Sequence, residues 1–342
     1  MKITTAAYAG EPVKICTDAS FKDINSLFTG NTVIVTDEHV FYLHENKFAG
    51  RPVIQVKSGE ENKIQSAVDR IVTELLELNV DKSWMLIGVG GGVLTDMAGY
   101  AASIYKRGIK LGLVPTTILG MTDAAIGGKN GVNVGMYKNM VGTTYRPQFI
   151  LYDWNFLDTL PKDEFVNGFA EIIKHACIKD VGMFKELQQH SIEYYIENRR
   201  ALVILIEKNI AIKTAIVVSD EHETGERYLL NFGHTFGHAI ENLYRLPHGH
   251  AVSIGMQMAA KISEELTGFD PESTQMLAKL STQYGLPVSR EIDPEKVLSL
   301  LSKDKKRQGS GINFVLLDRI GNGLVKPVSL ETLRSLTKKM MH

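Results

Sequence analysis

The sequence predicts two domains: a Rossmann-like α/β domain with a parallel sheet over residues 1–152, and a mainly α-helical domain over residues 153–342. The first observation is length, because 342 residues at about 150 residues per domain favour two domains. The second is the alternation of β-branched runs with helical periodicities before Asp153, which is typical of βαβ units. The third is the helical periodicity that dominates from residue 162 to about 305, which favours a helical second domain.

Composition and charge exclude several classes of protein. Hydrophobic residues make up 44% of the chain and charged residues 23%, which is typical of a globular protein with a substantial core. The 38 Lys and Arg residues balance 39 Asp and Glu residues, for a net charge of -1, so we expect no nucleic-acid partner. No apolar stretch is long enough to cross a membrane, and the two cysteines, Cys16 and Cys177, favour a reduced, cytoplasmic protein.

The elements of the first domain follow from hydrophobic period. Runs of β-branched and apolar residues predict strands at 31–37, 51–57, 83–92, 110–115 and 148–153. The segment from Ile64 to Leu78 predicts a helix, because its apolar residues recur on one helical face. A second helix is expected over residues 93–108, directly behind the glycines that end the third strand.

Helix boundary signals organise the second domain. Pro161 marks the expected start of its first helix, because proline suits the first helical turn. Residues 192–218 predict one long helix, and residues 251–268 predict another that ends at a glycine. A short β pair over residues 312–328 is expected to close the domain.

Glycines at the end of an expected strand point to a phosphate-binding turn. Residues 88–96 read GVGGGVLTD and join the third strand to the next helix. Backbone without side chains lets a pyrophosphate approach the amino end of a helix. Val93 stands where the dinucleotide-binding pattern GxGxxG has its third glycine, so a dinucleotide site and a tight structural turn both remain open.

Residues 115–139 predict a long, polar, glycine-rich loop, and such loops in compact domains are usually functional. Its hydroxyls, carboxylate, ammonium groups and amides suit a phosphorylated polyol. These groups belong to Thr116, Thr117, Asp123, Lys129, Lys138, Asn130, Asn133 and Asn139. The alternative is a solvated loop with ordinary turn chemistry. Arg107 lies just before a strand and is either another cation for this site or a surface residue.

A cluster of histidines predicts a metal site. Four of the ten histidines in the chain lie between positions 234 and 250, namely His234, His238, His248 and His250. His234 and His238 are four residues apart and share one helical face, while Glu171 adds a carboxylate from an earlier helix. Three nitrogen or oxygen ligands with an open position suit a catalytic divalent metal. Spacing alone leaves open which three residues coordinate.

Lysines at three further places in the chain are candidate cations for the site. Lys174 lies three residues after Glu171 on the same helical face, so that helix offers a carboxylate and an ammonium together. Lys213 lies among apolar residues of the long helix, where a lysine either extends its charge to solvent or faces a polar cavity. The run 303–307, with Lys305 and Lys306, is either a solvated cluster or a phosphate-binding edge.

Taken in order, these segments resemble the 3-dehydroquinate synthases, within the wider sugar phosphate cyclases. The matching segments are SGEENK (58–63), GGGVLTD, YKRG, PTT, TDAAIGGKNGVN, KNMVG, FLDTLP, GFAEIIKHACI, RYLLNFGHTFGHAIE, HGHAV, DKK and FVLLDRIG. The resemblance implies a dehydroquinate synthase-like fold, bound NAD, one Zn²⁺ or Co²⁺, and a homodimer. Three departures from the usual family pattern are His250 in place of a glutamate, Asn130 in place of a threonine and Tyr137 in place of a glycine.

The resemblance also implies a role for individual residues. The implied metal ligands are Glu171, His234 and His248. The implied NAD contacts are Asp37, Glu60, Lys63, Gly92, Val93, Asp96, Thr116, Thr117, Lys138, Phe156 and Thr159. The implied substrate contacts are Asp123, Lys129, Asn139, Lys174, Lys213, Arg227, Asn231 and His238, with one lysine of the pair Lys305 and Lys306. Arg107 resembles the arginine that reaches into the partner subunit's site.

The implied substrate is an anionic sugar phosphate, 3-deoxy-D-arabino-heptulosonate 7-phosphate, which the family converts to 3-dehydroquinate and phosphate in the shikimate pathway. The implied sequence is transient oxidation by NAD, phosphate elimination, reduction and intramolecular aldol closure. The planar guanidinium of Arg227 suits the substrate carboxylate. The alternatives are a related cyclase with another sugar phosphate substrate and a metal-dependent NAD(P) polyol or glycerol-phosphate dehydrogenase.

Overall fold

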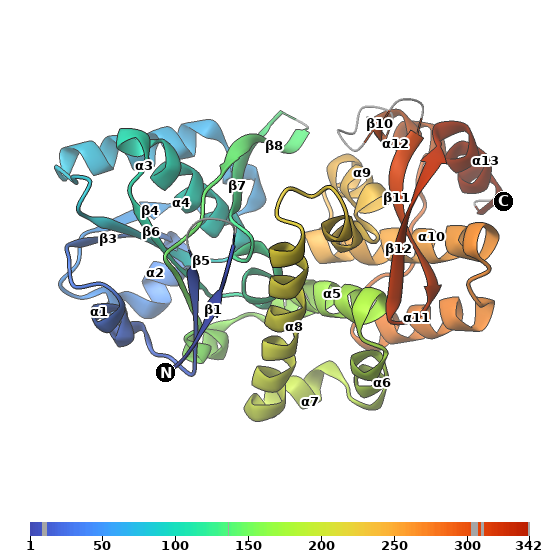
Figure 1. Ribbon diagram of the computed structural model, residues 1–342, viewed down its shortest axis with the longest axis horizontal. Coiled ribbons are helices and arrows are strands. Elements are labelled where there is room, and N and C mark those ends of the chain that lie inside the picture. Colours follow the sequence, from blue (N-terminus) through green and yellow to red (C-terminus); the bar gives the residue numbers. More distant parts are fainter. Residues whose placement is uncertain (9–11, 136, 302–306, 309–310, 341–342) are drawn as a thin grey trace. The chain divides into compact units, whose positions relative to one another are not determined.

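The computed structural model describes residues 1–8, 12–135, 137–301, 307–308 and 311–340. The chain forms two compact units. Unit 1 comprises Met1–Glu164 and Lys213–Glu221, and unit 2 comprises Phe165–Ile212 and His222–His342. Figure 1 shows the α/β elements of unit 1 and the mainly helical elements of unit 2, as the fold class predicted from the sequence requires.

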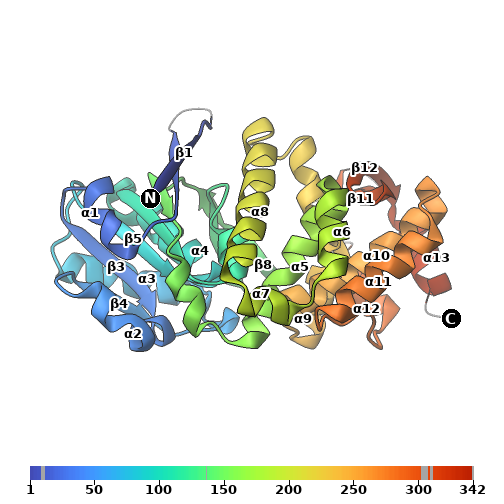
Figure 2. The ribbon, with the colours of Figure 1, turned by 90° about the horizontal axis from the view of Figure 1, so that it is seen from below.

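The described part of unit 1 is built on a seven-stranded sheet in the order β1-β2-β9-β6-β5-β3-β4. Its strands are β1 (Lys2–Ala6), β2 (Val13–Thr17), β3 (Thr32–Asp37), β4 (Val53–Val56), β5 (Met85–Gly90), β6 (Lys110–Pro115) and β9 (Phe149–Leu151). All neighbours pair in parallel except β1 and β2. The five expected strands are confirmed. Sequence analysis missed β1 and β2, and Figure 2 shows β1 projecting from the sheet, which agrees with its exposed side chains.

The strand order reverses at β3, which creates a ligand-binding position. After β3 the chain adds β4 on one side, and then β5, β6 and β9 follow on the other side. In open α/β sheets, ligands bind at such a switch point, outside the carboxyl ends of the strands. Here those ends carry Asp37 on β3 and Gly90 on β5.

Helices cover both faces of this sheet (Figure 1). One face packs against α3 (Gln65–Glu77) and α4 (Gly92–Ile104). Helix α3 buries Val68, Ile71 and Leu75, which share one side of the helix. The other face forms a core with α1 (Ile24–Leu27), α2 (Glu38–His44) and the short turns η1 (Phe21–Asp23), η2 (Glu45–Phe48) and η6 (Trp154–Thr159). Two further turns are η3 (Glu60–Asn62) and η4 (Tyr105–Arg107).

The expectation of one unstructured loop at 115–139 is wrong. The segment contains a π-helical turn, η5 (Gly120–Ala124), and the strand β7 (Lys129–Val134), which pairs antiparallel with β8 (Tyr137–Thr144). Alternation was hidden because β7 includes a glycine and two asparagines, which are poor strand formers. Gly131 has a packing reason, since a Cβ there would lie 2.5 Å from the carbonyl oxygen of Val141.

The expectation of one helix over 192–218 is also wrong, because the helical conformation is interrupted at Asn198. Helix α7 (Ile192–Glu197) ends there, and α8 (Arg199–Ser219) begins on the next residue. The side-chain oxygen of Asn198 accepts a hydrogen bond of 3.1 Å from the amide of Ala201. Asparagine at this position therefore caps a new helix instead of continuing the old one.

The remaining elements of the second half confirm the helical expectation. The helices are α5 (Lys162–Lys179), which follows Pro161, α6 (Val181–Gln189), α9 (His234–Tyr244), α10 (His248–Thr267), α11 (Pro271–Gln283), α12 (Pro294–Leu301) and α13 (Leu330–Met340), with a turn η7 (Glu226–Asn231). Helix α10 ends at Gly268, whose φ of 73° is left-handed. The expected β pair is β11 (Gly311–Arg319) with β12 (Asn322–Ser329), and β10 (Arg307–Gln308) pairs with β11. Within the described residues, each helix is too short or too polar to cross a bilayer.

Candidate metal and nucleotide sites

One face of α9 carries two members of the histidine cluster, His234 and His238. Gly233 precedes the helix with a φ of 79°, so the chain turns sharply into His234. His234 and His238 then lie one turn apart, with their ring centroids 5.2 Å from each other in a T-shaped arrangement. His234 is buried, and His238 is half-buried.

Glu171, His234 and His248 converge from three helices of unit 2. Glu171 lies on α5, and His248 is the first residue of α10. Nε2 of His234 and Nε2 of His248 each lie 3.4 Å from Oε1 of Glu171. One ligand atom from each residue lies within 4.8 Å of the others. The spacing alone had left the choice among the histidines open, and the structure brings this set together.

These three residues fit a divalent metal. Oε1 of Glu171 is buried and, among the described residues, makes no hydrogen bond. A separation of 3.4 Å is long for a hydrogen bond and close to the roughly 3.3 Å between ligands that each lie about 2.0 Å from a tetrahedral zinc ion. The donor set of two imidazoles and a carboxylate is one that zinc prefers, and it leaves one position for a substrate.

Electrostatics keep the carboxylate ionised. Burial on its own raises the pKa of Glu171, but the ammonium of Lys174 and the imidazoles of His234 and His248 outweigh this and hold the pKa well below its usual range. Lys174 is itself buried and forms an ion pair with Oε2 of Glu171. Burial lowers the pKa of His248, but its contacts with Glu171 and Glu241 reverse this and raise the pKa to about 10. A metal ion at this place therefore has to displace a proton from His248.

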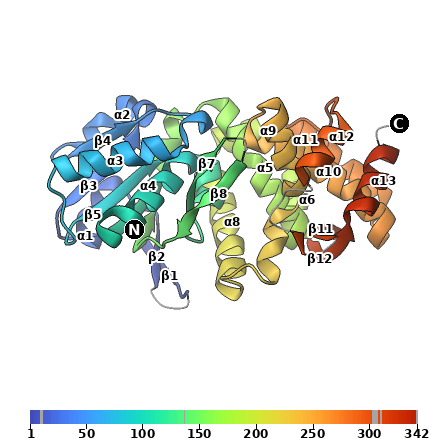
Figure 3. The same ribbon diagram turned by 90° about the horizontal axis from the view of Figure 1, so that it is seen from above.

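Glycines allow α9 and α10 to pack closely (Figure 3). A Cβ on Gly255 would lie 2.0 Å from the carbonyl oxygen of Gly233, and a Cβ on Gly237 would lie 3.1 Å from the Cα of Val252. The amino end of α10 is fixed separately, because the amide of Gly249 donates a hydrogen bond of 2.6 Å to Oδ1 of Asn167 on α5. Backbone packing thus brings the three ligand-bearing helices together.

The amino end of α4 in unit 1 has the features of a phosphate site. No side chain among the described residues caps this helix, which starts after Gly91 at the end of β5. Its first amides, at Gly92 and Val93, are free of intrahelical partners because of their position. Space around them is tight, since a Cβ on Gly92 would lie 2.9 Å from the Cβ of Ala124. The absence of a side chain on Gly92 therefore leaves room for a ligand to approach these amides. Gly92 and Val93 are both among the expected NAD contacts.

Thr116 and Thr117 lie beside this turn. The amide of Thr116 donates to the carbonyl of Gly90 at 2.9 Å, which ties the end of β6 to the end of β5. Oγ1 of Thr117 accepts a hydrogen bond of 3.0 Å from the amide of Gly120. Both threonines are therefore held next to the glycine turn by the backbone.

Lys63 is the centre of a polar network in unit 1. Its ammonium donates to Oδ2 of Asp96 at 2.5 Å and to Oδ1 of Asn139 at 2.6 Å. Burial raises the pKa of Asp96, although the charge of Lys63 opposes that shift. Glu60 joins the same region, because it accepts from Asn133 at 2.8 Å and pairs with Lys138 at 3.2 Å.

Asn139 couples two sets of expected contacts. The resemblance assigns it to the substrate, and its neighbours Lys63 and Asp96 to NAD. Its backbone is left-handed, with a φ of 53°, and its amide donates to Oδ1 of Asn133 at 3.1 Å. A non-glycine residue in this conformation is held by its surroundings, and such residues concentrate at functional sites.

The other expected NAD contacts lie near the ends of β3 and β9. Oδ1 of Asp37 caps α2 by accepting from the amides of His39 and Val40, and it also accepts from Ser58 at 3.1 Å. Oγ1 of Thr159 lies 2.8 Å from Nε2 of His44. The ring of Phe156 packs edge-on against that of His44, at 4.6 Å between centroids.

The contacts of Lys213 decide whether its charge extends to solvent or faces a polar group, which the sequence left open. Its ammonium donates to Oδ1 and to the carbonyl oxygen of Asp123, both at 2.5 Å, and the lysine is buried. The charge therefore faces a polar partner in unit 1 instead of extending to solvent.

The remaining expected contacts are less tightly grouped. Arg227 is buried in η7, and the side-chain amide Nδ2 of Asn231, at the end of that turn, donates to Oε1 of Glu223 at 3.0 Å. Lys129 is exposed at the start of β7. Arg107 is exposed just before β6, at the opposite end of that strand from Thr116, so unit 1 does not bring it near the phosphate turn. Lys305 and Lys306 lie outside the described residues.

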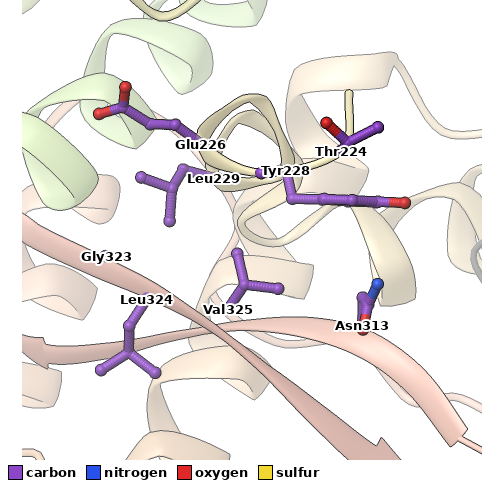
Figure 4. Close-up of a pocket in the computed structure, with 9 residues that line it drawn as sticks. Thr224, Glu226, Tyr228, Leu229, Asn313, Gly323, Leu324 and Val325 are labelled. Carbon is purple, nitrogen blue, oxygen red and sulfur yellow. The ribbon is translucent and has the colours of Figure 1, made fainter. Parts of the chain in front are cut away.

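A groove of about 420 Å³ lies between η7 and the β11–β12 ribbon (Figure 4). It is lined by Tyr228 and Leu229 from the turn and by Asn313, Leu324 and Val325 from the β11–β12 ribbon. Figure 4 shows the Tyr228 ring and the aliphatic side chains around it. The lining combines these aliphatic side chains with the polar groups of Thr224, Glu226 and Asn313, and it does not include the expected substrate contacts.

Sequence reasoning missed Glu241. It is buried on α9, and its Oε2 lies 3.3 Å from Nδ1 of His248. The signal was available, because position 241 is seven residues after His234 and returns to the same helical face. The contact that gives this carboxylate a role comes from His248 on α10, which the sequence of α9 does not reveal.

Two family models match consecutive parts of the chain. The model described as 3-dehydroquinate synthase N-terminal matches residues 53–167, and the one described as 3-dehydroquinate synthase C-terminal matches residues 168–307. The 3-dehydroquinate synthase of Campylobacter concisus is 40% identical over 320 residues, which cover 89% of this chain and 91% of that protein. The chain belongs to the 3-dehydroquinate synthase family. Another member, from Saccharolobus solfataricus, is 40% identical over 296 residues, or 84% of each protein.

Solved structures share the dehydroquinate synthase-like fold. 2-epi-5-epi-valiolone synthase from Streptomyces hygroscopicus, with NAD⁺ and Zn²⁺ bound, has a TM-score of 0.88 at 25% identity and covers 99% of each chain. 2-deoxy-scyllo-inosose synthase, complexed with carbaglucose-6-phosphate, NAD⁺ and Co²⁺, has a TM-score of 0.86 at 24% identity over 99% of this chain and 100% of that one. Sulfoacetaldehyde reductase from Bifidobacterium kashiwanohense has a TM-score of 0.68 at 14% identity over 98% of each chain. Cyclases and dehydrogenases thus share a fold, so fold alone does not choose the reaction.

Proposed function

We propose that this member of the 3-dehydroquinate synthase family converts 3-deoxy-D-arabino-heptulosonate 7-phosphate to 3-dehydroquinate and phosphate. The observation that carries the proposal is 40% identity to a 3-dehydroquinate synthase over 89% of the chain. The convergence of Glu171, His234 and His248 also supports it, because a metal held by these residues could polarise the hydroxyls of a polyol substrate. The phosphate and the carboxylate of this substrate are anions that the candidate lysine and arginine side chains could bind.

The cofactors proposed are NAD and one Zn²⁺ or Co²⁺. Glu171, His234 and His248 would hold the metal, and the turn of Gly92 and Val93 would hold the pyrophosphate. When bound, NAD would supply reversible hydride transfer with the substrate, and the metal would supply Lewis acidity toward the substrate hydroxyls. The proposed division assigns NAD to residues 1–152, and metal and most substrate recognition to residues 153–342.

The chain's own residues would bind and orient the substrate. Arg227 is buried, so its planar guanidinium can hold the carboxylate without competition from water. Lys129, Asn139, Asn231 and His238 would bind the phosphate, and charge-assisted hydrogen bonds there would also stabilise it as a leaving group. Lys174 keeps Glu171 ionised, and Asp123 fixes the ammonium of Lys213.

The test is a reaction with metal-loaded protein, a catalytic amount of NAD and the heptulosonate phosphate, followed by assay of phosphate and 3-dehydroquinate. We expect both products in equal amounts and no net NADH. Phosphate release only from a sedoheptulose or glucose phosphate would contradict the substrate and favour a related cyclase. Stoichiometric NADH from polyols or glycerol phosphate would instead favour a dehydrogenase.

The carboxylate role of Arg227 has its own discriminating variant. Arg227→Lys keeps the charge but loses the bidentate fork, so we expect KM for the heptulosonate phosphate to rise about tenfold or more. Lys208→Ala is the control, because Lys208 pairs with Glu186 on the surface. An unchanged KM in Arg227→Lys would remove the reason to prefer a carboxylate-bearing substrate.

A homodimer with a shared site is also part of the proposal. Arg107 is exposed, and it follows Lys106 in consecutive left-handed conformations with φ of 62° and 48°. Two residues in a row with left-handed backbone hold this exposed arginine just before β6, at the opposite end of that strand from the phosphate turn. Mixing inactive Arg107→Ala and inactive Glu171→Ala subunits should restore activity if each arginine serves the partner. No recovery from a mixed dimer would assign Arg107 to its own subunit.

A cytoplasmic location is proposed on the basis of cysteine use. Cys16 and Cys177 are both free and buried, which suits a reducing compartment. Fractionation of cells that express the tagged chain would test this directly.

A further inference from the structure

We propose that Glu241 is a positioning residue for the metal site, which orients His248 and increases its strength as a ligand. The inference rests on the metal role proposed above for His248. Glu241 is a carboxylate outside the implied ligand set. The two histidines of that set, His234 and His248, differ in the group that accepts a hydrogen bond from Nδ1.

The first step is placement on α9. Glu241 lies seven residues after His234 and three after His238, so the three side chains share one face of the helix. Glu241 is only 5% exposed. A carboxylate is rarely buried to this degree unless it is paired or hydrogen-bonded.

The second step is the contact with His248. Oε2 of Glu241 lies 3.3 Å from Nδ1 of His248. The other ring nitrogen, Nε2, lies 3.4 Å from Oε1 of Glu171. Because Nε2 is the atom that faces the proposed ligand set, Nδ1 keeps the proton and donates it to Glu241. This hydrogen bond selects the tautomer that leaves the Nε2 lone pair for the metal.

The third step is the difference between the two histidines. Nδ1 of His234 lies 3.2 Å from the backbone carbonyl oxygen of Phe232, which is a neutral acceptor. The acceptor for His248 is a charged carboxylate, which increases the basicity of the imidazole more strongly. The basicity of His248 is therefore increased more than that of His234. This increase depends on the side chain of Glu241, which can be substituted without a change to the backbone.

A direct ligand role for Glu241 is the competing interpretation. Ligand atoms of His238, Glu241 and His248 also lie within 4.8 Å of one another. A metal there would bind Nδ1 of His248, and Nε2 would then serve the first metal only if the ring lost its last proton. Positioning needs no such deprotonation, so one metal ion per chain is expected.

The experiment measures zinc affinity by chelator competition in the full-length protein. We expect Glu241→Leu to weaken zinc binding by about 10- to 100-fold. Glu241→Gln keeps an acceptor oxygen but no charge, so its affinity should fall between those of Glu241→Leu and the wild type. Glu186→Gln is the matched control, because Glu186 pairs with Lys208 on the surface of another helix. If Glu241→Leu does not fold, Glu241→Gln alone carries the comparison.

A second readout separates positioning from general structural damage. In the zinc-loaded wild type, nitrogen-15 NMR should show His248 protonated at Nδ1, and Glu241→Gln should shift that resonance while leaving the His234 resonance in place. Equal zinc affinity in Glu241→Gln, Glu241→Leu and wild type would overturn the inference and keep the metal site. Two zinc ions in wild type and one in Glu241→Gln would make Glu241 a ligand and overturn it. A wild type that binds no zinc would overturn the metal site and this inference together.

Discussion

Glu171 shows how a single buried residue acquires a chemical role. Its carboxylate lies in the core of unit 2, where an ionised group is stable only if its charge is compensated. Lys174 compensates one oxygen through an ion pair, and the other oxygen faces the Nε2 atoms of His234 and His248. The side chain is thus ionised and oriented before a metal arrives, so little reorganisation accompanies binding.

Removal of the ligands is the first prediction at this scale. Glu171→Ala and His234→Ala should lose bound zinc and activity together, by more than the roughly 10- to 100-fold expected for an outer contact, because each removes one of three protein ligands. His250→Ala should retain most of the metal. Metal analysis after gel filtration measures both. Equal loss of metal in His250→Ala would show that the histidine at position 250 coordinates as well.

The two thiols give a pH prediction. Burial raises the pKa of the Cys16 thiol from 9.0 to about 11 and raises that of Cys177 further. The unfolded chain therefore loses thiol protons near pH 9 while the folded chain keeps them. The free energy of unfolding should fall as the pH rises from about 9 to 11, and the thiols should resist alkylation in the native state.

Urea unfolding at pH 8 and pH 10.5 measures this effect. The matched control is the double variant Cys16→Ala, Cys177→Ala, which removes both thiols and should therefore lose their contribution to the fall in stability. Rapid labelling of either cysteine in native protein at pH 8 would contradict the prediction.

Individual site residues were predictable from the sequence to the extent that their chemistry was concentrated locally. Clustered histidines and a glycine turn are such local signals, and the resemblance chose among them. Glu241 was missed because its role depends on the neighbouring helix, which supplies His248. The left-handed backbone of Asn139 was likewise invisible, since it follows from tertiary hydrogen bonds to Lys63 and Asn133.

At the scale of elements, close packing of α9 on α10 determines whether the ligands meet. Gly233, Gly237 and Gly255 replace side chains by backbone contact where the helices approach each other. Asn167 holds the amino end of α10 against α5, which carries Glu171 one helical turn later. The histidine site therefore depends on residues that do not touch a metal.

Gly255→Ala tests this dependence. The added Cβ would lie 2.0 Å from the carbonyl oxygen of Gly233, so the helices must separate, at a cost of about 3 kcal/mol or more. Zinc affinity should fall in parallel with the free energy of unfolding. Gly182→Ala, at an exposed position of α6, is the control, because its Cβ would meet only the side-chain oxygen of Asp180, at 3.1 Å. A stable Gly255→Ala protein with normal zinc affinity would contradict the packing account.

Element prediction from sequence succeeded where hydrophobic period was strong and failed where tertiary contacts decided. The five strands of the parallel sheet are continuous apolar runs, which burial on both faces requires. The ribbon of β7 and β8 lacks that signal, because it is short of buried apolar side chains. The break at Asn198 depends on one capping hydrogen bond to Ala201, which an apolar pattern cannot reveal.

For the molecule as a whole, a metal bound at the proposed site would contribute to folding stability. Binding to the folded chain alone stabilises it by about 2.7 kcal/mol at a free metal concentration 100 times the Kd. A chain of this size gains a few degrees of Tm per kcal/mol at most. Chelation should therefore lower the Tm of unit 2 by several degrees in a calorimetric scan, and Glu171→Ala should show no further change on chelation. A Tm that is independent of zinc in the wild type would exclude a tightly bound ion.

Four lysines of the candidate sites have a carboxylate partner within their own unit: Lys63 with Asp96, Lys138 with Glu60, Lys174 with Glu171, and Lys213 with Asp123. An incoming phosphate or carboxylate must therefore replace a resident anion instead of entering an open positive field. Long-range steering should contribute little to the encounter, so the association rate should change little with ionic strength. The dissociation rate then discriminates among anions, because a ligand that does not replace the lost ion pairs with the lysines will dissociate quickly.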